Sequence, residues 1–400
     1  MTAKYRKCPV CGSECNKIIK HIQMVVPEDF LLPTEYDIVF CEDCGAVFND
    51  VPYSLAYDLY YENYKEITNF RVPSESGYSL NKVKIENRHF KTASFIETNA
   101  NLDKKAKILD VGCSYGATLL ALKDKGYCNL YGLDLDKSSI SYLQKVGIMS
   151  RIGSIFSDDL QEFNNKFDLI ILGHILEHLH EPKKAIANVK KWLKSNGMIM
   201  IECPDLYQYP ETSQFPGFFA EYEHINHFSM ISLMNLMLDF KLKAYRSDRT
   251  YALIEDFPCL YAIFEKKEAE MIIFRSLNDK LAMETSLTEP NIYGKVILSN
   301  IIGLYGNKIA IWGAGQYLYR LLTHTPLNEC DIQYIVDKNP SKWGKKILGI
   351  KITDPQELKA FDGTIVICTT TSLDSVVDDI KKMGLSNNFI IPFKEEGFLE

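Results

Sequence analysis

The stretch KILDVGCSYG, residues 107–116, decides the fold of this chain. Its apolar run at 108–111, interrupted by Asp110, predicts a buried strand, and the glycine turn 112–116 leads into a helix-like segment at 117–125. A buried parallel strand, a glycine turn and a helix N-terminus place a small ligand at the carboxyl end of the strand. Many nucleotide-binding folds use such a turn, so it predicts a ligand site without naming the ligand.

Strand-like and helix-like segments alternate from residue 106 to about residue 245. We expect strands at 107–111, 130–134, 167–172 and 197–202, and helices at 117–125, 137–146, 182–194 and 229–239. Such alternation is typical of βαβ units, so the predicted fold class is α/β and Rossmann-like. The second strand ends in Asp134, about 20 residues beyond the glycine turn, where an acid binds the two hydroxyls of a ribose.

Length and composition limit the classes of function. Four hundred residues suggest two or three domains, and 46% hydrophobic residues are enough for ordinary buried cores. The net charge of −7 and the pI near 5.7 argue against nucleic acid as the main partner. We expect no membrane partner, because no apolar run approaches the roughly 18 residues that a spanning helix needs. The opening MTAKYRKCPVCG lacks the apolar segment of a signal peptide, so a cytoplasmic location is predicted.

Four of the eleven cysteines form two Cys-x-x-Cys pairs that are each followed by glycine, Cys8 with Cys11 and Cys41 with Cys44. In each pair a tight turn brings two thiolates together, and two such pairs give the tetrahedral sulfur set of a structural Zn²⁺ site. A closed site of this kind has no open coordination position, so we predict a folding role for it. Four unrelated thiols or two redox pairs are the alternatives. Cys15 is a spare thiol that we expect to be buried.

Residues 51–100 are rich in tyrosine and are predicted to form helices at 52–64 and 79–100. Packing between neighbouring modules is one explanation for these tyrosines. The other is a substrate cleft, because a phenol forms hydrogen bonds to a polar ligand.

The last part of the chain repeats the strand, turn and helix pattern. A helix is expected at 267–286, and a second alternating segment follows at 308–394. Its turn, GAG at 313–315, has Leu318 where a dinucleotide fingerprint has its third glycine, although Asp337 stands where a ribose acid belongs. NAD binding is therefore the less favoured interpretation of this segment.

The order of strand, GCSYG turn, helix and Asp134 resembles class I S-adenosylmethionine (SAM) methyltransferases over residues 106–205. The resemblance implies that Gly112 and Gly116 face the methionine part of SAM and that Asp134 holds its ribose. The other residues assigned to the cofactor site on this resemblance are Asp110, Leu135, Ser154, Gly173 and His174. Ser154 departs from the acid that the family often has for the adenine amine, and Asp158 and Asp159 are the candidates to replace it.

Two other interpretations share parts of this pattern. An NAD-dependent dehydrogenase has the same strand, turn, helix and acid, but the third glycine of G-x-G-x-x-G is missing here. HILEH at 174–178 matches the H-x-x-E-H pattern of some zinc peptidases. Because it directly follows a core strand and soon meets Pro182, this pattern predicts no catalytic metal.

The loop EYEHINHFS at 221–229 brings a carboxylate, an imidazole and a phenol close together, as proton abstraction requires. Its Glu223 and His224, with a zinc module before them and a nucleotide-fold domain after them, resemble nucleotide-deoxysugar C-methyltransferases. That family has E-H-L-S-Y-F-S in this loop, so Asn226 and His227 depart from it.

The resemblance implies a reaction. His224 would remove the proton next to a sugar ketone, and the enolate would attack the methyl group of SAM, with Glu223 and Tyr222 as the other catalytic residues. A nearby phenol, Tyr61, Tyr64 or Tyr222, would stabilise the enolate oxygen. The alternatives are transfer to oxygen or nitrogen of a related sugar, RNA methylation, and an inactive methyltransferase fold.

The predicted domains are a zinc-binding module at 1–55, a SAM-dependent methyltransferase domain at 56–245, a helical connector at 246–305 and a Rossmann-like substrate-binding domain at 306–400. The predicted partner is a small nucleotide sugar, with no nucleic acid and no membrane, and we expect a monomer or a homodimer. Phe228 is expected in the core and Ser229 as a helix N-cap.

Overall fold

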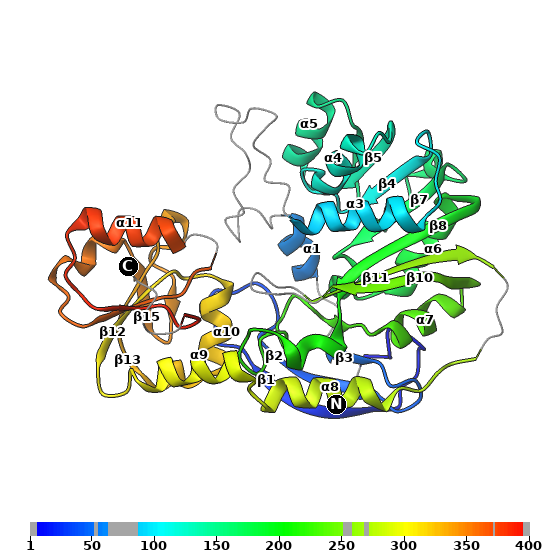
Figure 1. Cartoon of the computed structure of the whole chain (residues 1–400). Helices are drawn as coiled ribbons and strands as arrows, with labels where there is room; N and C mark the ends of the chain where they lie inside the picture. Colours follow the sequence, from blue (N-terminus) through cyan, green and yellow to red (C-terminus); the bar gives the residue numbers. More distant parts are fainter. Residues whose placement is uncertain are drawn as a thin grey trace. The chain divides into compact units, whose positions relative to one another are not determined.

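The computed structural model of the chain describes residues 6–51, 55–62, 87–250, 258–267, 272–370 and 373–394 (Figure 1). The chain divides into two compact units. The first contains residues 1–19, 39–208 and 223–281, and the second contains residues 20–38, 209–222 and 282–400.

A seven-stranded sheet forms the centre of the first unit, with the strand order β10-β11-β8-β7-β4-β5-β6. Its strands are β4 (Lys107–Val111), β5 (Asn129–Asp134), β6 (Met149–Ile152), β7 (Phe167–Gly173), β8 (Leu193–Pro204), β10 (Leu242–Thr250) and β11 (Cys259–Lys266). Strands β4 to β8 run parallel, while β11 is antiparallel to both of its neighbours. After β4 the chain adds β5 on one side and later β7 on the other, and ligands bind at such a switch point, beyond the carboxyl ends of the strands. This topology confirms the predicted α/β, Rossmann-like fold.

Helices cover both faces of this sheet (Figure 1). They are α3 (Asn87–Asn99), α4 (Ala117–Asp124) and α5 (Lys137–Lys145), together with α6 (Pro182–Trp192) and α7 (Met230–Leu238). Side chains alternate between the two faces along β4. Ile108 packs in the cluster that contains buried residues of α3, α4 and α5, whereas Leu109 packs with those of α6 and α7. Because both faces are covered, the carboxyl edge of the strands is the place for a ligand.

The helical connector expected at residues 246–305 is wrong in its first part. β10 and β11 lie there instead and extend the seven-stranded sheet. An antiparallel pair needs no crossover helix, so the alternation of strand and helix that identified the earlier strands does not extend to this pair.

The helix expected at residues 267–286 begins later than predicted, as α8 (Leu277–Thr288), and α9 (Ile292–Ile302) follows it. The segment before α8 has other hydrogen-bond partners. The Asn235 side chain donates to the carbonyl of Phe274 at 2.7 Å and accepts from its N–H at 2.9 Å. Because these backbone groups bond to a distant side chain, they are not available to a helix.

A smaller sheet has the order β1-β2-β3-β9. Its strands are β1 (Asn16–Gln23), β2 (Glu35–Cys41), β3 (Val47–Asp50) and β9 (Asn226–His227). The two residues of β9 belong to the loop 221–229 and pair antiparallel with β3. This pairing joins the N-terminal segment to the predicted catalytic loop.

Short helices connect these elements in the first unit. They are α1 (Leu55–Glu62) and the 3-10 turns η1 (Gln161–Phe163), η2 (Leu176–His178) and η3 (Leu206–Glu211). α1 falls within the helix expected at 52–64. α3 falls within the helix expected at 79–100, of which residues 79–86 lie outside the described residues.

The second unit contains a six-stranded sheet of order β14-β15-β13-β12-β16-β17. Its elements are β12 (Lys308–Trp312), α10 (Gln316–His324), η4 (Pro326–Glu329), β13 (Asp331–Val336), η5 (Pro340–Lys342), β14 (Lys346–Ile347), β15 (Ile350–Thr353), η6 (Pro355–Ala360), β16 (Thr364–Ile367), α11 (Leu373–Met383) and β17 (Phe389–Ile390). Its paired strands are parallel except β14 with β15. This sheet is the nucleotide-fold-like arrangement predicted for residues 308–394. Among the described helices of the chain, none is long and apolar enough to cross a membrane.

Candidate active site

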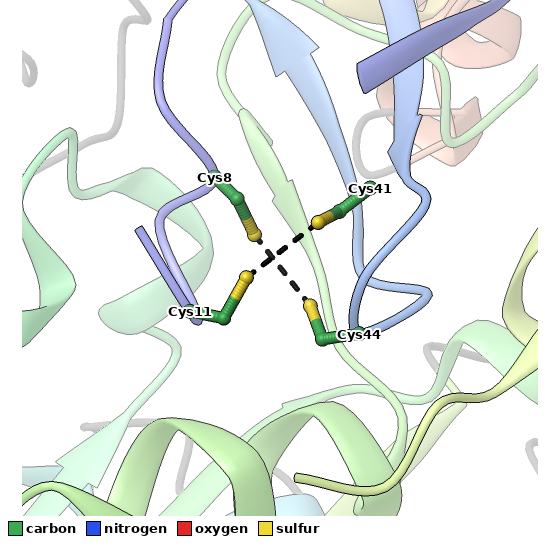
Figure 2. A group of neighbouring side chains, drawn as sticks. All are labelled: Cys8, Cys11, Cys41 and Cys44. Atoms are coloured by element: carbon green, nitrogen blue, oxygen red, sulfur yellow. Dashed lines mark hydrogen bonds between the residues drawn. The ribbon is translucent and has the colours of Figure 1, made fainter. Parts of the chain in front are cut away.

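Four thiols of the N-terminal segment point toward one another (Figure 2). The sulfur atoms of Cys8, Cys11, Cys41 and Cys44 all lie within 4.8 Å of one another, with 3.7 Å between Cys8 and Cys44 and 3.5 Å between Cys11 and Cys41. In a tetrahedral site with Zn–S bonds of about 2.3 Å, two sulfurs are about 3.8 Å apart, so the four thiols fit a zinc ion. Cys15, which was expected to be buried, is exposed, and its backbone rather than its thiol is held by neighbouring residues.

The glycine turn at 112–116 has the backbone shape expected of it, but its glycines meet protein atoms. Gly112 and Gly116 have φ values of +68° and +69°, in the left-handed region that favours glycine. A Cβ atom at Gly112 would lie 2.2 Å from Ile175 Cδ1, and one at Gly116 would lie 2.4 Å from Leu143 Cδ2. The left-handed backbone therefore favours glycine at both positions, and the ends of the Ile175 and Leu143 side chains would have to move to admit a Cβ atom.

Asp134 stands beside this turn, at the carboxyl end of β5. One carboxylate oxygen accepts the N–H of Ser114 at 2.8 Å, and the other accepts the N–H of Asp136 at 2.8 Å. These bonds fix the carboxylate where an acid contacts a ribose in this type of fold. Leu135 follows it and is 39% exposed, so a large apolar side chain borders the same edge of the sheet.

Ser154 follows β6 in a turn whose backbone bonds to the carbonyl of Asp134, so it lies beside the predicted ribose acid. Its hydroxyl accepts a backbone N–H within the same turn at 3.2 Å. Of the two acids considered as replacements, Asp159 pairs with Arg151 at 2.7 Å, whereas Asp158 is exposed.

His174 stands at the centre of a polar network after β7. Its φ of +54° is uncommon for a residue other than glycine and is typical of strained functional turns. Its Nδ1 lies 3.1 Å from Glu177 Oε1, and its Nε2 lies 3.3 Å from Glu202 Oε1 and 3.7 Å from Cys259 Sγ. Burial lowers the pKa of His174, but the bonds to Cys259, Glu177 and Glu202 outweigh burial and hold that pKa well above its usual value.

Acidic groups gather at the carboxyl edge of β4, β5 and β8. Asp110 is buried in β4, and this burial, with the negative charges of Glu202 and Asp134, raises the pKa of Asp110 well above its usual value. Burial also acts to raise the pKa of Glu202, but bonds to His174 and Thr92 lower it overall. The shifts therefore favour the ionised form of Glu202 beside His174 and the neutral form of Asp110. Gly173, the last residue of β7, would place a Cβ atom 3.8 Å from the Glu202 carboxylate, an ordinary contact.

The loop that carries Glu223 and His224 is fastened to η2, directly after β7. The N–H of Ile225 donates to the carbonyl of Glu177 at 2.8 Å, and His178 Nδ1 lies 3.0 Å from the carbonyl oxygen of Glu223. The rings of His178 and His224 are 4.9 Å apart. The structure therefore brings the predicted base next to η2, which follows β7 at the carboxyl edge of the sheet.

Tyrosines of α1 join this loop. Tyr60 donates a hydrogen bond to the Glu223 carboxylate, and the Tyr61 hydroxyl lies 3.0 Å from His178 Nδ1. Tyr61 was among the predicted phenols, and Tyr60 was missed. The spacing of residues 57, 60 and 61 puts three tyrosines on one face of α1, and this spacing is visible in the sequence. Tyr64 lies outside the described residues.

Tyr222 was predicted as a catalytic residue. It is buried and packs edge-on against Phe30, with ring centroids 4.7 Å apart. Tyr222 is close to His224 in the sequence, but this closeness did not predict the direction of its side chain.

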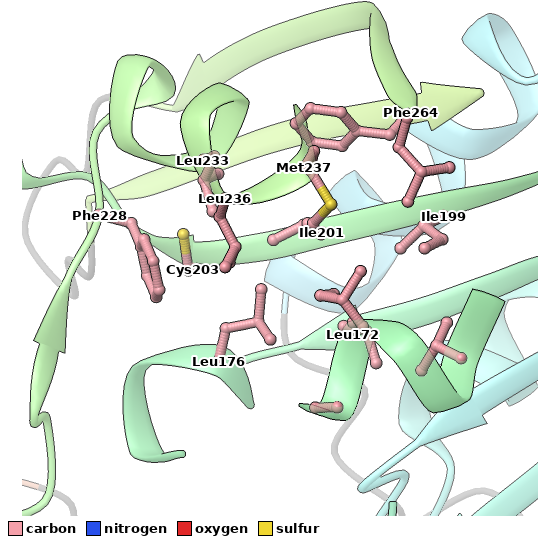
Figure 3. Packing of buried hydrophobic residues seen from close by; sticks show 14 of the residues in the cluster. Leu172, Leu176, Ile199, Ile201, Cys203, Phe228, Leu233, Leu236, Met237 and Phe264 are labelled. Atoms are coloured by element: carbon pink, nitrogen blue, oxygen red, sulfur yellow. The ribbon is translucent and has the colours of Figure 1, made fainter. Parts of the chain in front are cut away.

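Phe228 anchors the end of the loop 221–229 in the hydrophobic core (Figure 3). It is 1% exposed and shares a cluster with Leu176, Cys203 and Leu233. Ser229 caps α7, because its side chain accepts a backbone N–H three residues later. Both sequence predictions for these residues are confirmed.

The second unit has a pocket at the carboxyl edge of its sheet. Its volume is about 420 Å³, and its lining includes Trp312, Trp343 and Lys382. Nearby, Asp337 accepts a backbone N–H of the GAG turn at 2.8 Å and pairs with Lys342 at 2.9 Å. Because a lysine already neutralises this acid, its position gives little support to NAD binding.

Comparison with known proteins identifies two segments. Residues 85–246 match the family model described as a methyltransferase domain, and residues 305–391 match the one described as "C2185-like, N-terminal". Phosphoethanolamine N-methyltransferase 1 of Arabidopsis thaliana is 27% identical over 33% of this chain and 26% of its own length. Ubiquinone biosynthesis O-methyltransferase of Rickettsia prowazekii is 31% identical over 26% of this chain and 43% of its own length. The chain thus spans less than half of each of these relatives.

Among solved structures, the PH0226 protein from Pyrococcus horikoshii is similar with a TM-score of 0.39 and 15% identity. The match covers 51% of this chain and 99% of that protein. The match of residues 85–246, with the named relatives, confirms the prediction of a SAM-dependent methyltransferase domain in this part of the chain.

Proposed function

We propose that this chain transfers the methyl group of SAM to a carbon atom of a nucleotide-linked keto-deoxysugar. The observation that carries the proposal is the attachment of the Glu223–His224 loop to the turn after β7 through His178 and the backbone of Ile225. This attachment puts a candidate base at the carboxyl edge of the sheet. In a fold of this topology, the ligand lies at that edge.

The described residues fit SAM. Asp134 would contact the ribose hydroxyls, with Leu135 and Ser154 at the adenine side. SAM carries a sulfonium and an ammonium group, and the carboxylates of Asp134 and Glu202 at the carboxyl ends of β5 and β8 complement such charges. When bound, SAM supplies an electrophilic methyl group, so the protein has to produce a nucleophile and align it.

In this proposal, His224 removes the proton from the carbon next to the sugar ketone. The hydrogen bond from Tyr60 holds the buried Glu223 carboxylate in place beside this base. Tyr61 and His178 lie on the same side of the loop and would donate to the oxygen of the enolate as charge develops there.

We also propose that Cys8, Cys11, Cys41 and Cys44 bind a structural Zn²⁺ ion. The sulfur separations of 3.5 and 3.7 Å support this assignment, since a tetrahedral zinc site requires about 3.8 Å. Such a site contributes directly to folding.

The pocket of the second unit supports a nucleotide as part of the substrate. Trp343, which is 39% exposed, provides an aromatic surface for a base, and Lys382 provides a positive charge for a phosphate. Transfer to oxygen is the second candidate function, because one relative is named as an O-methyltransferase and the same base would deprotonate a hydroxyl.

The test is mass spectrometry of the full chain with SAM and a panel of nucleotide sugars, for the wild type and His224→Gln. We expect a methylated product from a keto sugar, its loss in the variant, and unchanged SAM affinity by calorimetry. His180→Gln is the control, because that histidine closely follows η2, to which the Glu223–His224 loop is attached, but its ring lies against the carbonyl of Val51. Solvent deuterium should exchange at the carbon beside the ketone in the wild type. Methylation without such exchange would favour oxygen, and full turnover by the variant would place the base elsewhere.

A further inference from the structure

Three side chains from three separate elements converge at the carboxyl edge of the main sheet. His174 follows β7, Glu202 lies near the end of β8, and Cys259 is the first residue of β11. Their ligand atoms all lie within 4.8 Å of one another. They are separate from the four thiols of the N-terminal segment, which form a group of their own.

The separations match those around a tetrahedral metal ion. With ordinary zinc bond lengths, an imidazole nitrogen lies about 3.4 Å from a carboxylate oxygen and about 3.6 Å from a thiolate sulfur on the same ion. His174 Nε2 lies 3.3 Å from Glu202 Oε1 and 3.7 Å from Cys259 Sγ. Both separations from His174 Nε2 therefore match those between ligands of one metal ion.

Hydrogen-bond partners that would orient two of these ligands are also present. Metal-binding histidines usually donate their other ring N–H to a carboxylate, which fixes the tautomer and the ring orientation. His174 Nδ1 lies 3.1 Å from Glu177 Oε1, so Nδ1–H donates to that carboxylate and Nε2 is the nitrogen turned toward Glu202 and Cys259. The second oxygen of Glu202 accepts the hydroxyl of Thr92 at 2.7 Å, which orients this carboxylate in the same way.

The location has the charge and the burial that a cation requires. Glu177, Glu202 and Cys259 are 1%, 4% and 2% exposed, so two carboxylates and a thiol lie buried around the His174 ring. Arg88 offsets part of this charge at Glu202. Imidazole, carboxylate and thiolate together are a ligand set that suits zinc among divalent metals.

We propose that His174, Glu202 and Cys259 bind a divalent transition-metal ion of the zinc type. Three protein ligands leave one coordination position open, as in catalytic rather than structural zinc sites. The zinc-peptidase pattern at 174–178 does not describe this site: of its residues His174 alone is a ligand, Glu177 is its hydrogen-bond acceptor, and the other two ligands come from distant strands. The proposal does not depend on the methyl acceptor or on the role of His224.

The experiment is a titration of the full chain with Co²⁺, followed by absorption spectroscopy and equilibrium dialysis, for the wild type and Cys259→Ser. We expect the wild type to bind one more ion than the variant, with a thiolate-to-cobalt band that the variant lacks. Comparing the two proteins removes any contribution of the four N-terminal thiols, which both retain. Cys128→Ser is the matched control, because it removes an exposed thiol elsewhere and should keep the extra ion.

Two further variants separate the proposal from a simple loss of folding. Glu202→Gln keeps the shape of the side chain, and we expect at least tenfold weaker Co²⁺ binding. Thr92→Val changes only the second shell, where about a tenfold loss of metal affinity is typical. Circular dichroism checks that each variant is folded. Equal numbers of bound ions in the wild type and Cys259→Ser would overturn the proposal and leave the three side chains as a hydrogen-bonded cluster. The same conclusion follows if Glu202→Gln binds Co²⁺ as tightly as the wild type.

Discussion

Acidification should destabilise the first unit through one histidine of the loop 221–229, His227. It is 1% exposed, and its Nε2–H donates to the side-chain oxygen of Asn49 at 3.0 Å. Burial lowers the pKa of His227 to about 3. Protonation would place a charge in a site without water, so this imidazole stays neutral in the folded protein at pH values where an unfolded one is charged.

The sign and size of the effect follow from linkage. An unfolded histidine has a pKa of about 6.5, so the stabilising contribution of His227 is complete above that pH and is lost as the pH falls toward about 3. Between pH 7.5 and 5.0 the free energy of unfolding should fall by about 2 kcal/mol on account of this residue alone. His227→Gln removes the titration but keeps an amide N–H that donates to Asn49.

The assay is urea unfolding of the wild type and His227→Gln at both pH values, followed by circular dichroism. The variant should lose about 2 kcal/mol less than the wild type between pH 7.5 and 5.0, because all other titrating groups are common to the two proteins. His227→Tyr is a second variant without the imidazole and carries the residue that the resembled family has in this loop. His21→Gln controls for loss of an exposed histidine. Identical pH dependence in the wild type and His227→Gln would refute the buried, neutral state.

Three other predictions follow from single contacts. Gly116→Ala adds a Cβ atom to a residue with a φ of +69°, and this atom would lie 2.4 Å from a side-chain carbon of α5. The free energy of unfolding in a urea titration should fall by at least about 1–2 kcal/mol. An unchanged midpoint would show that the turn can relax. Tyr60→Phe removes a donor from the buried carboxylate of Glu223 and should lower turnover about tenfold or more with SAM affinity unchanged, whereas wild-type turnover would remove Tyr60 from the site. Glu221→Gln leaves the buried guanidinium of Arg320 without its counter-charge. The free energy of unfolding of the second unit, measured by heat or urea, should fall by about 3–5 kcal/mol. A loss below about 1 kcal/mol would contradict this account.

The predicted parts of the fold are those in which local sequence determines local structure. The strand at 107–111, its glycine turn and the helix after it are contiguous, and Asp134 follows at a fixed distance set by one βα unit. β11 could not be found in this way, because it is defined by pairing with β8 across more than 50 residues of chain. β9 has two residues, and no periodicity can be read from two residues.

The same distinction between local and long-range contacts applies to the candidate site. Sequence reasoning proposed Tyr222, Glu223 and His224, which are adjacent in the sequence, as catalytic residues and did not propose Tyr60. The carboxylate of Glu223 bonds to Tyr60, 163 residues away, and His174 meets Cys259, 85 residues away. Contacts between residues so far apart in the sequence depend on the order of the strands in the sheet and on the direction of the side chains. Neither can be predicted from a single sequence.

The four thiols are distant in the sequence from the proposed reacting groups, but the N-terminal segment connects them. We therefore expect the metal ion that they are proposed to bind to affect turnover. Cys41 ends β2 and Cys44 lies in the turn before β3, and β3 pairs with β9 in the catalytic loop. Asn49 of β3 holds that loop in two further ways: its side chain donates to the carbonyl of His224 at 3.1 Å, and its backbone N–H donates to the carbonyl of Ile225 at 2.9 Å.

Loss of the proposed zinc ion would release the turn between β2 and β3 first. The backbone of His224 would lose its support next, while Asp134 and the glycine turn keep theirs from β4 and β5. Metal removal under mild conditions should therefore reduce turnover before it reduces SAM affinity, and a parallel loss of both would show that the N-terminal segment supports the whole unit rather than this loop.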